Sequence, residues 1–253
     1  MARLVCFVAS AMLMASVPSF GDVVFDDPTL DLSHYTATAQ FVDAQAVSIV
    51  ASNCASCGVG AGEALQFVSA FGDTTSAQGD VDLGFLNNTF VYDPSTQGAI
   101  LSIAASADKN ISLNISIAGG NPFGNTFRPM IEQDGVFYLA AIPGPGITSG
   151  SSGFNTLAKS GLSAADFTSF DFSTFTFGSQ HPNFAGDTMV FGVAQLTGIK
   201  GYTNPNPVVT TAYDNLNFDL TTVPAVPEPT SLVLFGSLLP ALAAIRMNRR
   251  RCN

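Results

Sequence analysis

Two cysteines stand three residues apart in the segment Cys54-Ala55-Ser56-Cys57. Asn53 before them and Gly58-Val59-Gly60 after them favour a turn between two strands, whereas a redox Cys-x-x-Cys motif requires the start of a helix. In an oxidising compartment such a pair is expected to be a disulfide. Metal binding or redox chemistry is the alternative. The spacing therefore predicts a disulfide, Cys54–Cys57, that closes a small loop.

Side chains suited to acid–base chemistry are scarce between residues 22 and 226, which hold the glutamates Glu63 and Glu132 and the histidines His34 and His181. Neither histidine has a second ligand at metal-binding spacing, and no Gly-x-Ser-x-Gly or His-Glu-x-x-His motif occurs. A glycosidase needs two carboxylates roughly 5–10 Å apart, and the sequence selects no such pair. It therefore predicts that the protein is not an enzyme, with an extracellular hydrolase as the least favoured alternative.

Aspartate and asparagine side chains are placed where they could bind a hard cation. Ca²⁺ takes several oxygen ligands, and Asp26-Asp27 could meet Asp214-Asn215 if the two ends of the domain lie together. Asp27 and Asp214 are therefore candidate ligands for a structural calcium ion. Asp80-Val81-Asp82 is interpreted as a second acidic loop, although it lacks the ligand ladder of an EF-hand. The alternative is that these are ordinary turn aspartates and that no cofactor is bound.

Tyrosines are the candidate sugar-stacking side chains, because the chain has no Trp and most of its 21 Phe are expected in the core. Tyr202 lies in Gly201-Tyr202-Thr203-Asn204-Pro205-Asn206-Pro207, which has the composition of an exposed loop. Tyr202 is therefore the first candidate for contact with a carbohydrate ligand. The alternative is a turn or strand-edge tyrosine without a ligand.

The charge distribution argues against nucleic acid as a partner. Residues 22–226 contain four basic residues and 18 acidic ones, a net charge of −14. Nucleic-acid affinity depends on neutralising phosphates with Lys and Arg, which this stretch does not supply. The composition fits a secreted domain, or one that recruits cations.

Short apolar or alternating runs, separated by Gly, Pro and polar residues, predict about ten strands. In 111–117 the apolar residues fall at every second position, as in a strand with one wet face. The run 171–177 is similar, with Phe172, Phe175 and Phe177 available to the core. The segment 162–167 is one helical turn with Ser163 as N-cap. The expected strands are 34–42, 45–50, 64–71, 89–93, 98–105, 111–118, 135–142, 170–177, 188–196 and 211–220.

These patterns predict an all-β domain at residues 22–222, an antiparallel β-sandwich that is jelly-roll-like. A propeller or β-helix would show a fixed repeat, and none is present. The chain should begin with a signal-peptide helix at residues 1–21. Arg3, the apolar run 4–17 and the small residues Ser19 and Gly21 give the three parts of such a peptide, with cleavage before Asp22. The alternative is a permanent transmembrane helix, but the run is shorter than the roughly 20 residues required.

The C-terminus combines a Pro-rich linker at residues 223–230 with an apolar run and a basic end. Residues 231–253 predict a short transmembrane helix, which Pro240 weakens, followed by positive charges retained in the cytoplasm. A simple single-span anchor is one interpretation. The basic end consists of Arg246, Arg249, Arg250 and Arg251.

Pro227-Glu228-Pro229, the apolar helix and the Arg cluster, in that order, resemble the PEP-CTERM sorting signal over about the last 28 residues, Val226 to Asn253. Cys252-Asn253 after the arginines is a small departure. The resemblance implies recognition by an exosortase of an exopolysaccharide-producing bacterium with an outer membrane. It also implies transient anchoring in the inner membrane, then cleavage and release to the cell surface or beyond.

The layout of the middle domain loosely resembles lectin-like and carbohydrate-module-like sandwiches, on the stretches 91–100 and 212–218. This resemblance implies a fold class only. Together the observations predict an exported cell-surface or extracellular-matrix protein with a structural or adhesive sandwich. The alternative is a calcium-stabilised module that binds exopolysaccharide.

Overall fold

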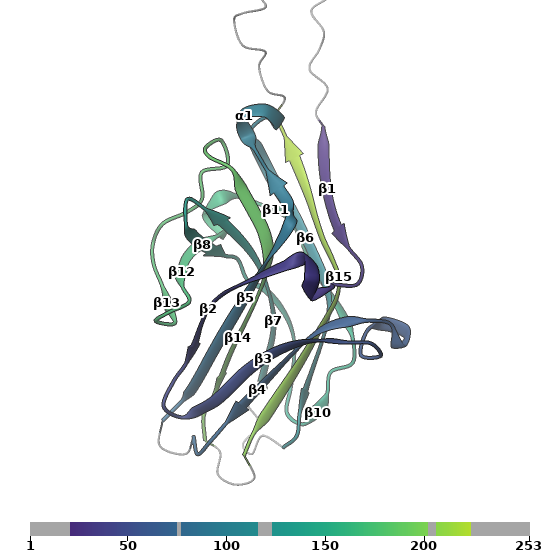
Figure 1. The fold of residues 1–253 in the computed structure, drawn as a ribbon, viewed down its shortest axis with the longest axis vertical. Coiled ribbons are helices and arrows are strands. Elements are labelled where there is room, and N and C mark those ends of the chain that lie inside the picture. The colour runs from purple at the N-terminus through teal and green to yellow at the C-terminus, as the bar shows by residue number, and fades with distance from the viewer. Residues whose placement is uncertain (1–20, 75–76, 116–122, 202–205, 224–253) are drawn as a thin grey trace, which may run out of the picture.

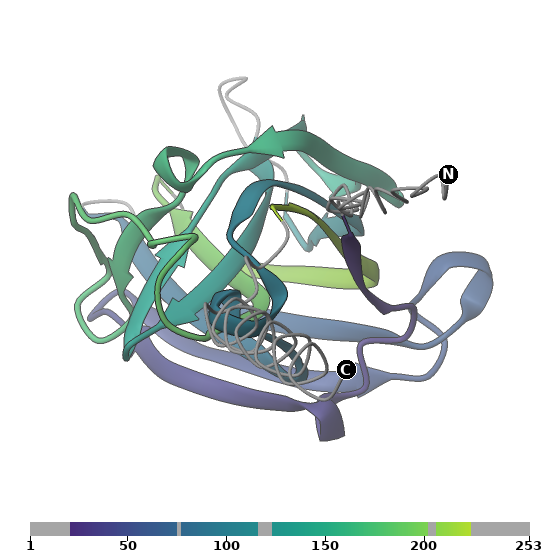
Figure 2. The ribbon, with the colours of Figure 1, turned by 90° about the horizontal axis from the view of Figure 1, so that it is seen from above.

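Two antiparallel β-sheets pack face to face in the computed structural model, which describes residues 21–74, 77–115, 123–201 and 206–223 (Figures 1 and 2). The prediction of an all-β antiparallel sandwich is confirmed at this level. The signal-peptide helix predicted at 1–21 and the helix predicted at 231–253 lie outside the described residues, apart from Gly21. In the described ranges no helix is long and apolar enough to cross a bilayer.

The seven-stranded sheet has the order β10-β6-β15-β4-β3, with β1 paired to β15 and β11 paired to β6. Its central strands β6 and β15 run antiparallel with Lys109 opposite Tyr213. The segments 98–105 and 111–118 were predicted as two strands, but residues 100–105 and 111–113 belong to the single strand β6, and residues 116–118 lie outside the described ranges. The strands are β1 (Asp22–Asp27), β3 (Ala46–Cys54), β4 (Ala64–Phe71), β6 (Ile100–Leu113), β10 (Gly150–Ser151), β11 (Asn155–Leu162) and β15 (Val208–Thr222).

The eight-stranded sheet has the order β13-β12-β8-β7-β14-β5-β2, with β9 paired to β7. Its strands are β2 (Tyr35–Val42), β5 (Gly79–Tyr92), β7 (Phe123–Gln133), β8 (Val136–Leu139), β9 (Ile142–Ile147), β12 (Thr168–Asp171), β13 (Thr176–Phe177) and β14 (Met189–Ile199). In the part of the chain that the structure describes, four short helical segments join strands: η1 (Leu32–His34), η2 (Val59–Ala61), α1 (Pro94–Gln97) and η3 (Ala164–Asp166). The predicted turn at 162–167 is confirmed as η3, which Ser163 and Asp166 close with a capping box.

The first and last strands of the described domain pair with each other. β1 runs antiparallel to β15, with Asp22 opposite Thr221 and Asp27 opposite Leu216. The two ends of the domain therefore lie at the same pole, as Figure 1 shows. The prediction that they come together is confirmed. Asp80 and Asp82, predicted to lie in a loop, instead belong to β5, where they pair with Gly198 and Leu196 of β14.

Aromatic side chains fill the space between the sheets. Phe67, Phe191, Phe218 and Tyr213 are fully buried, and each Phe buried in this way contributes roughly 1.5–3 kcal/mol to stability. The rings of Phe67 and Tyr213 meet edge-on with centroids 5.7 Å apart, and those of Phe191 and Phe218 are 5.2 Å apart. The first pair lies within the seven-stranded sheet and the second joins the two sheets, so the core depends on ring packing both within and between the sheets.

A second hydrophobic cluster lies on the outer face of the eight-stranded sheet. We call it the outer cluster, and its buried members are Met130, Leu139, Phe170, Phe172 and Ala194. The turn between β12 and β13 folds over this face and seats the Phe172 ring against Gly84, where a Cβ would lie 2.7 Å from the ring. Because Gly84 has no side chain, the Phe172 ring can pack directly against the backbone of β5.

The prediction of one continuous strand over 170–177 is wrong. Asp171 accepts hydrogen bonds from the Ser173 N–H at 2.8 Å and from the Thr174 hydroxyl at 2.9 Å. These local bonds offer the backbone a turn in place of a sheet ladder. Phe172 is buried as predicted, but Phe177 is 48% exposed and does not belong to the core.

Candidate functional site

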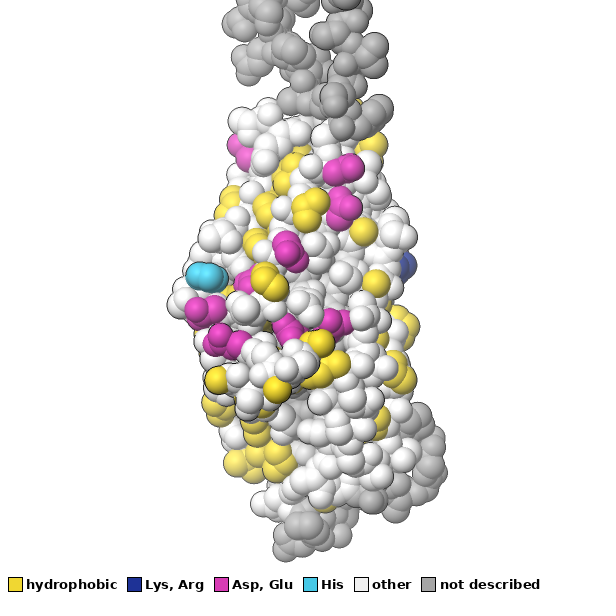
Figure 3. All heavy atoms as spheres, turned by 90° about the vertical axis from the view of Figure 1, so that its right-hand side faces the viewer, with side chains coloured by type: hydrophobic (Ala, Val, Ile, Leu, Met, Phe, Trp, Pro, Cys, Tyr) yellow, Lys and Arg dark blue, Asp and Glu magenta, His cyan; other side chains and the backbone are white. Residues whose placement is uncertain are grey.

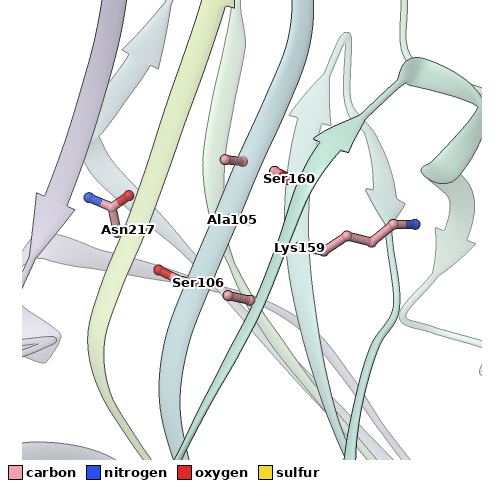
Figure 4. A pocket seen from close by; sticks show the side chains of 7 residues that line it. Ala105, Ser106, Lys159, Ser160 and Asn217 are labelled. Atoms are coloured by element: carbon pink, nitrogen blue, oxygen red, sulfur yellow. The ribbon is translucent and has the colours of Figure 1, made fainter.

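A shallow groove of about 300 Å³ lies on the seven-stranded sheet, between β15, β6 and β11 (Figure 4). Its depth follows from small residues on β6 and from irregular strand pairing on both sides. The register of β11 on β6 shifts between Lys159 and Leu162, and that of β15 on β6 shifts between Asp214 and Asn217. Such bulges bend a strand locally. The lining residues are Ala104, Ala105, Ser106, Ala158, Lys159, Ser160 and Asn217.

Hydroxyl and amide groups supply the polar chemistry of the groove. Among the described residues, the side chains of Ser106, Ser160 and Asn217 have no hydrogen-bond partner. Lys159 is already paired, because its Nζ lies 2.9 Å from Oδ1 of Asp166, and Figure 4 shows it pointing away from Ser106 and Asn217. The groove can therefore donate and accept hydrogen bonds, and its lining contains no carboxylate or imidazole.

Acidic side chains are spread as separate groups over the side of the molecule that carries β1 (Figure 3). One carboxylate of the domain, Asp108 of β6, is tied into a local hydrogen-bond network. Asp108 accepts hydrogen bonds from the Thr156 hydroxyl and, at 2.7 Å, from the Asn215 amide. These bonds join β6, β11 and β15 below the groove. Asp108 therefore helps to hold these three strands in register.

The two candidate calcium ligands lie on paired strands but accept hydrogen bonds from different groups. Asp27 is buried and accepts from the Tyr35 hydroxyl at 2.9 Å, the Asn87 amide at 3.2 Å and the Leu30 N–H at 2.8 Å. Asp214 accepts from the Val59 N–H at 2.7 Å. Within the described ranges, no group of three or more His, Cys, Asp or Glu side chains could hold a metal ion. Calcium binding stays a prediction.

The predicted disulfide is present at the tip of the β3–β4 hairpin. Cys54 and Cys57 are bonded, with Cα atoms 5.4 Å apart. The Gln66 amide donates to Sγ of Cys57 at 3.4 Å, and the Asp214 bond to Val59 fastens the same loop to β15. The pair therefore shapes a loop, as its spacing predicted.

The residues considered for catalysis are dispersed. Glu132 accepts the Gly135 N–H at 2.6 Å in the β7–β8 turn, and Nδ1 of His181 lies 2.7 Å from the Phe167 carbonyl oxygen. His34 is in η1, and Glu63 follows η2. Glu132 and His181 are thus engaged in local contacts, and His34 and Glu63 lie in or beside a short helical segment. None of the four lines the groove.

Lys109 is a charged residue whose position the composition alone does not reveal. It is 2% exposed, its Nζ donates to the Thr126 carbonyl, and it lies 4.8 Å from the ring centroid of Tyr213. Burial, and to a lesser degree the charge of Arg128, lowers the pKa of Lys109 well below its ordinary value. The sequence pattern does indicate that Lys109 is buried, because it lies between Ala107 and Ile111 in the series of alternate residues that face the core.

Asp82 is a second buried ionisable group, beside the outer cluster. It is fully buried, and its Oδ1 accepts the Phe41 N–H at 2.9 Å. Its Oδ2 has no partner in the described part of the chain. Burial, together with the negative charge of Asp171, raises the pKa of the Asp82 carboxyl to about 7, although the bond from Phe41 partly offsets this.

The remaining predicted site residues lie outside the described residues. They are Tyr202, the sorting motif Pro227, Glu228 and Pro229, and the cluster Arg246, Arg249, Arg250 and Arg251. Their roles stay predictions.

No family model and no curated protein matches the chain. Among solved structures, it is similar to a carbohydrate-binding module that recognises mannan, at 11% identity over 80% of this chain and 99% of that one, with a TM-score of 0.35. A xylan-binding domain of Paenibacillus barcinonensis Xyn10C matches at 9% identity over 81% and 97%, with a TM-score of 0.30. Basic winged bean lectin with Tn-antigen matches at 8% identity over 79% and 99%, with a TM-score of 0.34. Scores this low carry no argument about the ligand of this chain.

Proposed function

We propose that the chain is an exported surface or matrix protein whose jelly-roll-like sandwich adheres to extracellular polysaccharide without catalysis. The observation that carries the proposal is the groove on β6, β11 and β15. It presents the unpartnered polar groups of Ser106, Ser160 and Asn217, and its lining has no acid–base pair. A few convergent hydroxyl and amide groups in a concavity are what recognition of a sugar's hydroxyls requires.

The sorting part of the proposal rests on the sequence. An exosortase would recognise Pro227, Glu228 and Pro229 while the C-terminal helix holds the chain in the inner membrane. Cleavage would then release the sandwich to the cell surface or the extracellular matrix.

The adhesion proposal predicts that two side chains in the groove account for glycan binding. We expect the double variant Ser106→Ala, Asn217→Ala to bind neutral glycans about ten-fold more weakly or worse, because each lost hydrogen bond contributes about 1 kcal/mol. The measurement is a titration of the full-length chain in detergent micelles with the best ligand from a glycan array, with and without calcium.

Ser102→Ala is the matched control, because Ser102 lies on the same strand but outside the groove lining. Equal affinities of the double variant and this control would remove the groove as the binding site. Binding that requires calcium would favour the calcium-stabilised module.

The sorting proposal predicts that the double variant Glu228→Ala, Pro229→Ala stays uncut in the inner membrane. Pro224→Ala, in the same linker but outside the motif, should be processed like the wild type. Fractionation of producing cells, with immunoblotting of each fraction, measures both. Normal release of the motif variant would show that the tail is not an exosortase signal.

A further inference from the structure

A row of contacting aromatic rings crosses the outer face of the eight-stranded sheet, opposite the groove. The rings of Phe41 and Phe175 have centroids 5.8 Å apart, those of Phe175 and Phe170 are 5.9 Å apart, and those of Phe170 and Phe177 are 4.7 Å apart. The guanidinium carbon of Arg128 lies 5.4 Å from the Phe177 centroid. We call these four rings and Arg128 the aromatic row.

The aromatic row is accessible to solvent in part. Phe170 is buried beneath it, but Phe41 and Phe175 are only partly buried and Phe177 is 48% exposed. The row therefore offers a ligand the face of one half-exposed ring, Phe177, and parts of Phe41 and Phe175.

The backbone at Phe175 is held in an unfavourable conformation. Phe175 has a φ of +56°, a region that bulky L-residues rarely occupy. The turn that contains it is fixed by the bonds from Ser173 and Thr174 to Asp171. The result is that the Phe175 ring extends the row from Phe170 to Phe41. Backbone strain of this kind is retained where the surrounding structure uses it, which points to a functional surface.

Arg128 ends the row with an unused set of hydrogen-bond donors. Among the described residues, it contacts the Phe177 ring but makes no hydrogen bond or ion pair. Lys159 and Lys109 both have such partners, Asp166 and the Thr126 carbonyl. An unpaired guanidinium is conspicuous in a domain with 18 acidic residues. Its planar fork matches the geometry of a carboxylate.

Two carboxylates lie near the aromatic row. Asp82 is buried and is the cross-strand partner of Phe41, whose N–H it accepts. Asp171 lies opposite Thr176, next to Phe177, and its oxygens accept hydrogen bonds from Ser173 and Thr174. Arg128 forms an ion pair with neither of these two acids. More distant carboxylates are screened at physiological salt, where the Debye length is about 8 Å. A ligand would place apolar surface over the rings and its anion at Arg128.

We infer that the aromatic row binds a uronic-acid residue of an acidic polysaccharide. The apolar face of the sugar lies against the exposed ring surface of Phe175 and Phe177, and its carboxylate accepts a bidentate pair of hydrogen bonds from Arg128. The inference rests on the proposed function in one respect, that the ligand is a polysaccharide. It assigns a second surface, distinct from the groove, and a ligand class.

The test compares oligogalacturonate with its methyl ester, which is the same sugar chain without the charge. We expect the full-length chain in detergent micelles, at 0.15 M salt, to bind the acid at least ten-fold more tightly than the ester. Arg128→Gln should abolish this preference. Lys200→Gln, which removes an exposed cation outside both the groove and the aromatic row, should leave it intact.

Two ring variants test the apolar contact. Phe177→Ala removes a half-exposed ring, and Phe175→Gly removes a ring while supplying the residue that tolerates a positive φ. Both should weaken binding of acid and ester alike by ten-fold or more. Thermal unfolding of each variant confirms that it is folded.

Failure of the inference can be told apart from failure of the proposed function. Unchanged acid preference in Arg128→Gln, or equal loss in Lys200→Gln, overturns the inference. Binding of neutral glycans in the groove would still leave the proposed function in place. Concentration-dependent dimerisation that Phe177→Ala abolishes, without glycan binding at the row, also overturns it, because the row would then be a self-association surface. Absence of any glycan binding overturns both.

Discussion

Replacing Gly192 with alanine should prevent the eight-stranded sheet from forming. Gly192 lies in β14, between β7 and β5, where the register of β14 on β5 shifts. An added Cβ would lie 1.9 Å from the Phe85 carbonyl oxygen and 2.8 Å from the Leu86 Cα. Both atoms are backbone, so relief requires separating two central strands. Overpacking against side chains costs typically about 1–3 kcal/mol, and a backbone clash should exceed that.

Such a loss is large against the roughly 5–15 kcal/mol that stabilises a typical domain. Urea unfolding, followed by near-ultraviolet circular dichroism, is the measurement. Gly124→Ala is the matched control, because a Cβ on Gly124 in β7 would meet nothing within 4 Å. A Gly192→Ala protein that unfolds at the same urea concentration as the control would show that β14 and β5 do not pair in this register.

Replacing Asp82 with asparagine should make the domain more stable at pH 8 and flatten its pH dependence. The pKa of Asp82 is raised to about 7 in the folded state, from an ordinary value of 3.8, so the folded state holds this proton more tightly than the unfolded state does. The stabilisation from the protonated acid is fully present below pH about 4 and is lost as the pH rises to about 7. The loss is on the order of 4 kcal/mol.

Asparagine is neutral throughout this range and keeps an oxygen to accept the Phe41 N–H. The difference in free energy of unfolding between variant and wild type, measured in urea from pH 4 to pH 8, isolates this one group. Asp171→Asn is the control of opposite sign, because hydrogen bonds from Ser173 and Thr174 lower the pKa of Asp171. It should destabilise the domain at pH 7. A difference between Asp82→Asn and wild type that does not grow with pH would mean that Asp82 is solvated.

Local patterns in the sequence predicted local structure well. The bounds 64–71 coincide with β4, the Ser163 cap closes η3, and the Cys54–Cys57 spacing gives the disulfide. Each of these depends on residues a few positions apart. The alternating run at 111–117 likewise marked the outward and inward faces of β6 as far as Leu113.

Features built from distant segments were not predictable in this way. The groove needs β11, β6 and β15 side by side, which is a property of strand order. Asp82 was interpreted as a loop residue. Its place in a buried strand depends on Phe41 of β2 and on β14, which are distant in sequence, so local patterns could not reveal it. The aromatic row was missed because most Phe were assigned to the core, and the turn at Asp171 that leaves Phe177 outside was not recognised. The predicted site residue Tyr202 lies outside the described residues.

The pairing of β1 with β15 determines how the domain would carry mechanical load. β15 ends at Thr222, beyond which the chain continues toward the linker, and the same strand carries Asn217 in the groove. Tension between a tethered linker and a polysaccharide held in the groove would therefore run along β15. Its hydrogen bonds to β6, β1 and β4 lie across that direction and share the force at once. This is a shear geometry, in which many hydrogen bonds must break together. An adhesive module built this way would resist unfolding under tension. The opposite sheet would not lie in the path of the force.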